Sequence, residues 1–333
     1  MKHVVVTGDL RGENIRPPSL FSRLRQLSIE DSQTYFGERS TLVEVACPAC
    51  GSPTGRLVFE KNGFRYDECP DCGSVFVSPR PSPEALADYY RRSRASLFRV
   101  EHFARETAEA RRAHILRSHA NWLGRLVDEA GNREARGYAD IESNYPVILE
   151  EVRRLGLFDR LYSLNPHPAF DAACAASGAT VCRNGVSGLG ALTAFEVLEH
   201  QFSPHDFLRV AFESLAPGGL LFFTTRTISG FDLQVLWDRA PYIYVPEHLN
   251  LLSLDGIGVL LARSGFTLVE LSTPGRLDVE LARRAAREDP SIVLPPFIAC
   301  LLHRRDAEAH ADFQAFLQKH RLSSHVRVAA QKP

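Results

Sequence analysis

The chain has 333 residues, of which 44% are hydrophobic, and its formal net charge is −1 at pH 7. This length allows a full-sized core domain with a small module beside it. The near-neutral charge argues against a nucleic-acid surface, and no apolar run approaches the length of a membrane span. We therefore expect neither a nucleic-acid partner nor a membrane span.

Residues 1–40 have a mixed composition and include Pro17-Pro18. We expect an irregular N-terminal arm here, with one helix near Leu20–Leu27. The apolar stretch that follows Met1 is too short for a signal peptide.

Two cysteine pairs dominate the next segment, in the pattern C-x2-C-x18-C-x2-C formed by Cys47, Cys50, Cys69 and Cys72. Four thiolates at this spacing can close a tetrahedron around one structural Zn²⁺, and a Gly follows each pair where a turn needs a positive φ. The alternatives are two unrelated pairs or two disulfides. We predict a zinc ribbon over residues 41–82. Reduced zinc ligands indicate a cytoplasmic protein.

The segment between the two pairs predicts a hairpin, with Arg56–Phe59 and Phe64–Tyr66 as its strands and Asn62-Gly63 at its tip. After the ribbon, Ser82 can cap a helix that has Pro83 at its first position. Residues 83–133 are rich in Ala, Arg and Glu, with apolar residues at helical spacing, and so predict a helical linker or cap.

Residues 134–333 alternate between strand and helix patterns, which predicts an α/β fold with a doubly wound, mostly parallel sheet. Ligands in such sheets bind at the carboxyl ends of the strands. The His325–Ala330 segment is expected to form the last, edge strand. The other predicted strands are Tyr138–Ile141, Arg160–Leu164, Thr180–Cys182, Ala191–Val197, Gly219–Thr225 and Thr267–Leu271, and the predicted helices are Val147–Leu155, Ala169–Ser177, His205–Leu215, Asp255–Ser264 and Ala307–Lys319.

Three motifs in this part carry a family resemblance. They are Phe195-Glu-Val-Leu-Glu199-His200, Leu215-Ala-Pro217-Gly-Gly219, and Val245-Pro-Glu247-His248. With the cysteine ribbon, they resemble class I S-adenosylmethionine-dependent methyltransferases. More narrowly, the chain is similar over about residues 41–331 to a bacterial branch with an N-terminal zinc ribbon. That branch implies a Rossmann-like methyltransferase domain acting on a sugar, polysaccharide or natural-product acceptor.

The candidate catalytic residues follow from position and from this resemblance. His200 directly follows an apolar strand, where an imidazole can act as a base, hold a substrate hydroxyl, or simply cap and pack. Glu247 and His248 lie after the aromatic segment that contains Tyr244, in a region which the resemblance places over the acceptor pocket. The resemblance implies His248 as the base, whereas the alternative is a loop hydrogen-bonded for structure. The candidate set is His248, His200, Glu247 and Tyr244.

The cofactor motif departs from the family pattern, which has several glycines after the first strand. Asp140 fits, but Glu142 stands where backbone should approach the cofactor. The second strand ends at Asn165, a neutral residue where a carboxylate would accept the ribose hydroxyls, and the loop before Ala191 lacks an acidic residue. The candidate cofactor residues are Asp140, Glu142, Asn144, Asn165 and Glu196.

Three altered contacts favour a cofactor site that is weakened, lost or repurposed. The sequence therefore leaves two main hypotheses, a methyltransferase and a pseudo-methyltransferase that serves as a binding or scaffold subunit. A different enzyme on the same scaffold is a third possibility, because a fold does not determine a function.

Overall fold

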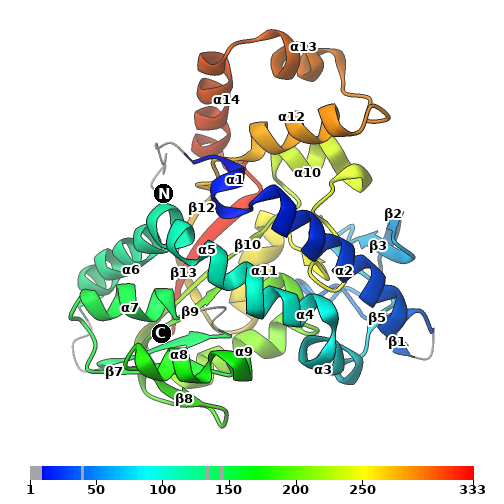
Figure 1. The fold of residues 1–333 in the computed structure, drawn as a ribbon. Helices are drawn as coiled ribbons and strands as arrows, with labels where there is room; N and C mark the ends of the chain where they lie inside the picture. The colour runs from blue at the N-terminus through cyan, green and yellow to red at the C-terminus, as the bar shows by residue number, and fades with distance from the viewer. Residues whose placement is uncertain (1–9, 39–40, 132–134, 143–145) are drawn as a thin grey trace.

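The computed structural model describes residues 10–38, 41–131, 135–142 and 146–333 (Figure 1). Its centre is a seven-stranded sheet in which β13 alone runs against the other strands. In spatial order the strands are β8 (Thr180–Cys182), β7 (Arg160–Leu164), β6 (Gly137–Ile141), β9 (Leu189–Phe195), β10 (Leu215–Arg226), β13 (His325–Gln331) and β12 (Thr267–Ser272). The predicted doubly wound, mostly parallel sheet is therefore confirmed.

The last strand differs from the expectation. β13 does not lie at the edge of the sheet, because it is inserted between β10 and β12 and pairs with both. Its five central residues, Val326 to Ala330, are all buried, as an internal strand requires.

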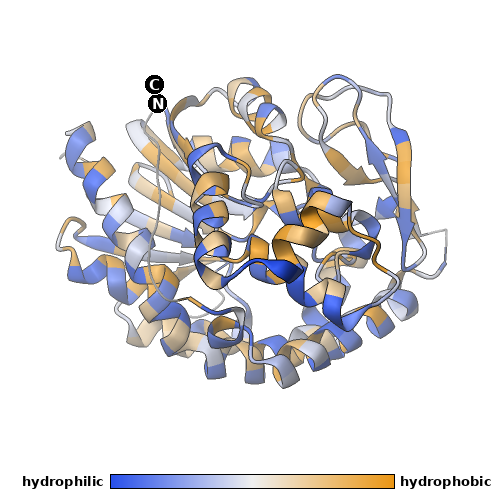
Figure 2. Cartoon of the chain, turned by 90° about the horizontal axis from the view of Figure 1, so that it is seen from above, coloured by the Kyte–Doolittle hydropathy of each residue, from blue (hydrophilic) through white to orange (hydrophobic). Residues whose placement is uncertain are grey.

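Helices cover both faces of the sheet. Side chains of β10 alternate between the faces, so that Leu220 and Phe222 pack with one group of helices while Leu221 and Phe223 pack with the other. The first group contains α6 (Arg117–Ala130), α7 (Val147–Arg154) and α8 (Asp171–Ala176), and the second contains α9 (Pro204–Ser214) and α11 (Leu254–Arg263). In Figure 2, orange and blue bands alternate along many of the helices, so these helices carry both hydrophobic and hydrophilic residues.

The predicted hairpin is confirmed as β2 (Arg56–Lys61) and β3 (Phe64–Glu68). Asn62 and Gly63 both have positive φ, at 52° and 86°, as an Asn-Gly hairpin turn requires. β4 (Val75–Val77) and β11 (Asn250–Leu251) complete a four-stranded sheet, and β1 (Leu42–Val43) pairs with β5 (Arg80–Pro81). β11 lies between β10 and β12 in the chain, so a strand from the region of the large sheet completes the sheet of the ribbon.

The N-terminal arm is not irregular over its described residues, and this expectation was wrong. It forms α1 (Gly12–Ile15) and a 19-residue helix α2 (Pro18–Phe36), which starts with Pro at its first turn. Leu24, Leu27 and Phe36 of α2 are buried in a cluster with ribbon and α3 residues. Tertiary packing therefore extends the short helix predicted near Leu20–Leu27.

The segment between ribbon and sheet is helical, as predicted. It comprises α3 (Pro83–Arg92), α4 (Arg94–Phe98), α5 (Ala104–Arg111) and α6, with π-helical turns at Arg99–Phe103 and Arg112–Leu116. Ser82 caps α3 by accepting a hydrogen bond from the N–H of Ala85 at 3.2 Å.

A helical insertion separates β12 from β13. It contains α12 (Asp278–Glu288), α13 (Pro296–Arg304) and α14 (Ala307–Lys319), of which only α14 was predicted, and it has its own small core. α10 (Phe231–Leu236) packs against α12 (Figure 1). Within the described ranges, none of the helices combines the length and apolar character needed to cross a bilayer.

Candidate functional site

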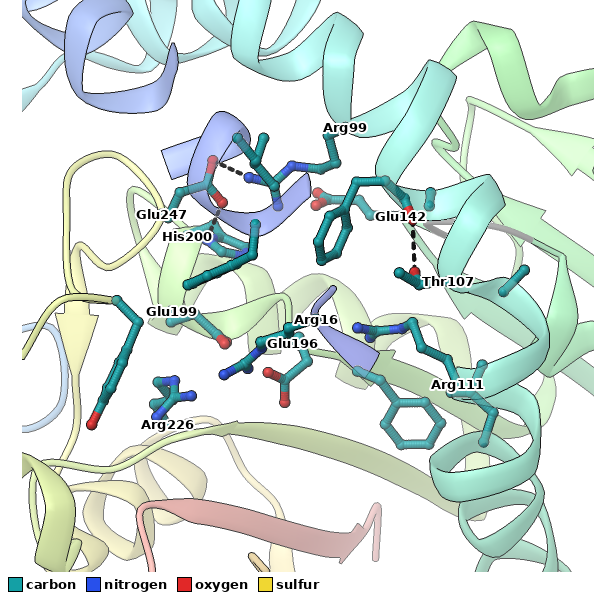
Figure 3. Close-up of a pocket in the computed structure, with 18 of the residues that line it drawn as sticks. Arg16, Arg99, Thr107, Arg111, Glu142, Glu196, Glu199, His200, Arg226 and Glu247 are labelled. Atoms are coloured by element: carbon teal, nitrogen blue, oxygen red, sulfur yellow. Dashed lines mark hydrogen bonds and ion pairs between the residues drawn. The ribbon is translucent and has the colours of Figure 1, made fainter. Parts of the chain in front are cut away.

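A cavity of about 170 Å³ opens at the carboxyl ends of β6 and β9 (Figure 3). Its floor comes from the residues that follow these strands, and one wall comes from the loop before β11. The opposite wall comes from α2, α5, the turn at Arg99–Phe103, and Arg16, which precedes α2. Segments from all parts of the chain therefore meet where a doubly wound sheet binds ligands.

Three adjacent strands end in the same backbone geometry. Glu142, Asn165 and Glu196 each follow a strand directly and have positive φ angles of 52°, 49° and 58°. Each donates its backbone N–H to a carbonyl of the neighbouring strand, at 2.8, 2.9 and 3.0 Å respectively. A left-handed conformation costs a non-glycine residue about 1 kcal/mol or more, and such residues cluster at functional sites. Three candidate cofactor residues therefore share one strained edge of the sheet.

The predicted cofactor residues differ in how they lie relative to the cavity. Asp140 is 3% exposed, and its Oδ1 accepts a hydrogen bond from the Thr193 hydroxyl at 2.5 Å, so that carboxylate is tied to β9. Glu142 lines the cavity, and burial of its carboxyl in the cleft raises its pKa above the usual range. Asn165 lies outside the residues that line the cavity. Asn144 lies outside the described residues.

Glu196 is the charged centre of the site. Its Oε1 accepts a hydrogen bond from the Thr224 hydroxyl at 3.0 Å and lies 3.3 Å from Nδ1 of His325. Although burial opposes ionisation, the charges of His325, Arg226 and Arg111 hold the pKa of Glu196 well below its usual range. This carboxylate is therefore ionised at neutral pH.

The structure brings the four predicted catalytic residues together. The rings of His200 and His248 lie 6.3 Å apart, and the rings of Tyr244 and His248 lie 5.8 Å apart. Glu247 is 3% exposed and is held by Arg99, with Nη2 2.5 Å from Oε1, while its Oε2 lies 3.8 Å from Nδ1 of His200 (Figure 3). His200, which follows β9, and Glu247, in the loop before β11, therefore form a histidine–carboxylate pair between two separate segments.

Burial controls the protonation of this group. It lowers the pKa of His200 and, more strongly, that of His248, so both imidazoles are neutral at pH 7. Burial and the negative charge of Glu196 raise the pKa of Glu199 to about 8, so this carboxyl is protonated at pH 7. Nδ1 of each histidine is buried and has no hydrogen-bond partner within the described parts of the chain. Both imidazoles thus retain bonding capacity for a ligand in the cavity.

The ribbon fixes the loop that carries Glu247 and His248. The Tyr66 hydroxyl donates to the carbonyl oxygen of His248 at 3.2 Å, and the N–H of Leu249 donates to the carbonyl oxygen of Glu199 at 2.9 Å. The side-chain amide of Asn250 donates to the carbonyl oxygen of Gln201 at 2.7 Å. The loop is therefore clamped between the ribbon and the end of β9.

Sequence reasoning missed the arginines of the cavity. Arg16, Arg99, Arg111 and Arg226 all line it, yet they come from the arm, two helical segments and the end of β10. They lie in no motif and are widely separated along the chain, so no local signal identifies them. Only the folded structure shows that these four arginines line the same cavity.

A second group of side chains forms a candidate metal centre. The Sγ atoms of Cys47, Cys50, Cys69 and Cys72 all lie within 4.8 Å of one another, with pairs at 3.4 and 3.6 Å. Ligands at about 2.3 Å from a tetrahedral Zn²⁺ would be about 3.8 Å apart. The seven cysteines of the sequence are all in the described part of the chain, and none forms a disulfide. The donor set and its spacing therefore fit zinc.

The two cysteine knuckles have the same backbone. The N–H groups of Gly51 and Gly73 donate to the carbonyl oxygens of Cys47 and Cys69 at 2.9 and 2.8 Å. Both glycines have positive φ, at 80° and 68°, as expected from the residue that follows each pair.

With this fold and site described, the chain can be compared with known proteins. Residues 168–271 match a family model described as a methyltransferase domain. The match covers about a third of the chain, so this part of the chain is similar to a methyltransferase domain. The comparison with curated proteins found no match to this chain.

Several solved structures are similar in fold to this chain. An S-adenosylmethionine-dependent methyltransferase from Thermotoga maritima shares 12% identity, with 69% of this chain and 98% of that chain covered and a TM-score of 0.41. The cyclopropane synthase MmaA2 from Mycobacterium tuberculosis shares 16% identity, with 62% and 83% covered and a TM-score of 0.37. CalS10, an amino pentose methyltransferase from Micromonospora echinaspora, shares 20% identity, with 36% and 54% covered and a TM-score of 0.31.

The described residues fit the methionine end of S-adenosylmethionine better than its ribose end. Carboxylates of Glu142 and Glu196 face a cavity that would hold the cofactor's cationic ammonium and sulfonium groups. At the ribose end, Asn165 offers an amide in place of a carboxylate. The donor set therefore fits the cofactor, with fewer charge-assisted bonds at one end.

Proposed function

We propose that this protein transfers a methyl group from S-adenosylmethionine to a small acceptor, at a hydroxyl or carbon of a sugar, polysaccharide or natural product. The observation that carries the proposal is the cavity at the ends of β6 and β9. It places two neutral imidazoles and a buried carboxylate beside the candidate cofactor residues. A reaction of this kind needs a base that can accept the acceptor's proton next to the cofactor.

His200 is the better placed of the two bases. Once protonated, its imidazolium would lie beside the carboxylate of Glu247, whereas a protonated His248 would face the positive charge of Arg226. Arg99 orients Glu247 through their 2.5 Å ion pair. In this proposal His200 removes the proton, Glu247 stabilises the resulting cation, and His248 and Tyr244 hold the acceptor.

S-adenosylmethionine supplies the electrophilic methyl group when it is bound. Asp140, Glu142 and Glu196 would hold its methionine end, and Asn165 would accept or donate a hydrogen bond at the ribose. The walls formed by α2 and α5 would exclude water from the reacting groups. A structural zinc in the four-cysteine site, and with it a reducing cytoplasmic location, completes the proposal.

A second candidate function is a pseudo-methyltransferase that binds a ligand without methyl transfer. Two observations favour it. Glu142 occupies a left-handed position that the family pattern gives to glycine, and the cavity does not extend to Asn165. Crowding at the first site and loss of a charged bond at the second both weaken cofactor affinity.

Calorimetric titration of the zinc-loaded protein with S-adenosylmethionine, and separately with its demethylated product, decides between the two. Dissociation constants in the low micromolar range support the methyltransferase proposal. Absence of binding at about 1 mM rejects it and leaves the pseudoenzyme. A control is Asn184→Asp, an exposed change outside the cavity lining, which should leave the affinity unchanged.

A further inference from the structure

A second cavity, of about 120 Å³, adjoins the first and is not needed for methyl transfer as proposed above. The two cavities share Arg16, Arg111, Arg226 and Glu196 in their walls. The second cavity extends away from His200 and Glu247, between α5, β13 and the start of the insertion at α12. It has room for a group much larger than one water molecule.

Charge in this second cavity is strongly unbalanced. Its lining includes five arginines but only two carboxylates, those of Glu196 and Asp278. Two of the arginines already have acidic neighbours: Arg226 lies 3.8 Å from Asp232, and Arg327 lies 3.2 Å from Glu270. The other three arginines are Arg16, Arg111 and Arg276.

These three guanidinium groups have few hydrogen-bond or ion-pair partners among the described residues. Arg276 donates to the carbonyl oxygen of His114 at 2.6 Å, and Arg16 lies over the ring of Phe21. Among the residues that the structure describes, neither Arg16 nor Arg111 has an ion-pair partner within bonding distance. Burial and the nearby charge of Arg226 lower the pKa of Arg16 to about 10. Arg16 and Arg111 are partly buried, and cations removed from water are normally paired.

A neutral polar group completes the lining. His119 is 6% exposed, and its Nδ1 has no hydrogen-bond partner in the described parts of the chain. Its ring stacks on that of His325 at 6.3 Å, and burial holds its pKa well below the usual range. A buried nitrogen without a partner indicates a missing ligand or water.

We propose that the second cavity binds an oxyanion, the phosphate or carboxylate group of a ligand, between Arg16, Arg111 and Arg276, with His119 beside it. Guanidinium groups suit such anions because their N–H groups match the geometry of paired oxygens. The shared wall then lets an acceptor place its anionic group here and its reacting group near His200. This last step rests on the proposed methyl transfer, whereas the anion site does not.

The test is calorimetric titration of the zinc-loaded chain with inorganic phosphate and, separately, with acetate. Saturable binding of either anion is expected, and the one that binds more tightly identifies the group. Arg111→Gln and Arg276→Gln should each weaken it by about tenfold or more, because each removes charge-assisted hydrogen bonds. Arg105→Gln, an exposed change on the same helix as Arg111, should leave it unchanged.

Three results would overturn the anion site. These are no saturable binding of either anion, an equal loss in Arg105→Gln, or complete loss of phosphate binding when S-adenosylhomocysteine is present. The last would assign the arginines to the cofactor's carboxylate. Circular dichroism identifies a variant that fails to fold; if Arg111→Gln fails, Arg276→Gln carries the test, and if Arg276→Gln fails, Arg111→Gln carries it. If phosphate binds while S-adenosylmethionine does not, only the methyl-transfer proposal fails.

Discussion

Glu199 offers a direct test of the electrostatics in the cavity. It is 2% exposed, and burial together with the nearby Glu196 raises its pKa from 4.5 to about 8. The Thr225 hydroxyl donates to its Oε2 at 2.7 Å. At pH 7 this carboxyl is therefore protonated in the folded chain and ionised in the unfolded chain.

The sign of the resulting pH dependence follows from proton counting. Between pH 4.5 and about 8 the folded chain holds one proton more than the unfolded chain, so raising the pH favours unfolding. This contribution is complete below the unfolded pKa and is lost as the pH rises through the folded pKa. A shift from 4.5 to about 8 corresponds to about 5 kcal/mol in total.

Glu199→Gln removes this titration while keeping an oxygen that can accept the hydrogen bond from Thr225. We expect its free energy of unfolding, relative to the wild type, to improve by about 2–3 kcal/mol between about pH 5.5 and about pH 7.5. Urea unfolding of the zinc-loaded proteins measures this change. Glu213→Gln, at an exposed position on α9, is the matched control and should show no such trend. Parallel curves for wild type and Glu199→Gln would refute a protonated Glu199.

Three further predictions concern the base, the metal and the cofactor. His200→Ala should slow methyl transfer by about 10²-fold without changing the affinity for S-adenosylhomocysteine, since a general base acts in turnover; full activity in both this variant and His248→Ala would remove the assignment. Metal analysis should give about one zinc per chain, and Cys69→Ser should lose the metal and much of its solubility; under about half an equivalent in wild type counts against the ribbon. Asn165→Asp should bind S-adenosylhomocysteine about tenfold more tightly in calorimetry, because a carboxylate restores charge-assisted bonds to the ribose; unchanged affinity would place the ribose elsewhere.

The fold could largely be predicted from the sequence because its signals are local. Periodicity and turn residues located the strands of the large sheet and the hairpin with Asn62-Gly63 at its tip. The errors arose where distant contacts decide. β13 inserts beside β10 although nothing in its own residues distinguishes an internal strand from an edge strand. α2 extends to Phe36 because that ring is buried against the ribbon region, which the arm's sequence does not reveal.

The site could be predicted only in part, for the same reason. Glu196 and His200 are recognisable because they follow an apolar strand, and Glu247-His248 because it lies in a motif. The pairing of Glu247 with Arg99 joins positions far apart in the chain and has no sequence signature. Glu199 was visible in its motif, but its raised pKa depends on burial and on the neighbouring Glu196, which only the folded structure establishes.

The ribbon contacts the candidate site because β11, which follows the loop with Glu247 and His248, is a strand of the ribbon's sheet. β11 pairs with β4, so the folded ribbon holds the end of the loop that precedes β11. Tyr66 of the ribbon then holds the backbone of His248, and Leu249 holds that of Glu199. A closed four-cysteine site contributes folding free energy when it binds its metal. A metal bound by the four cysteines would therefore be coupled to the placement of His248 beside His200, through the pairing of β11 with β4 and the hydrogen bond from Tyr66.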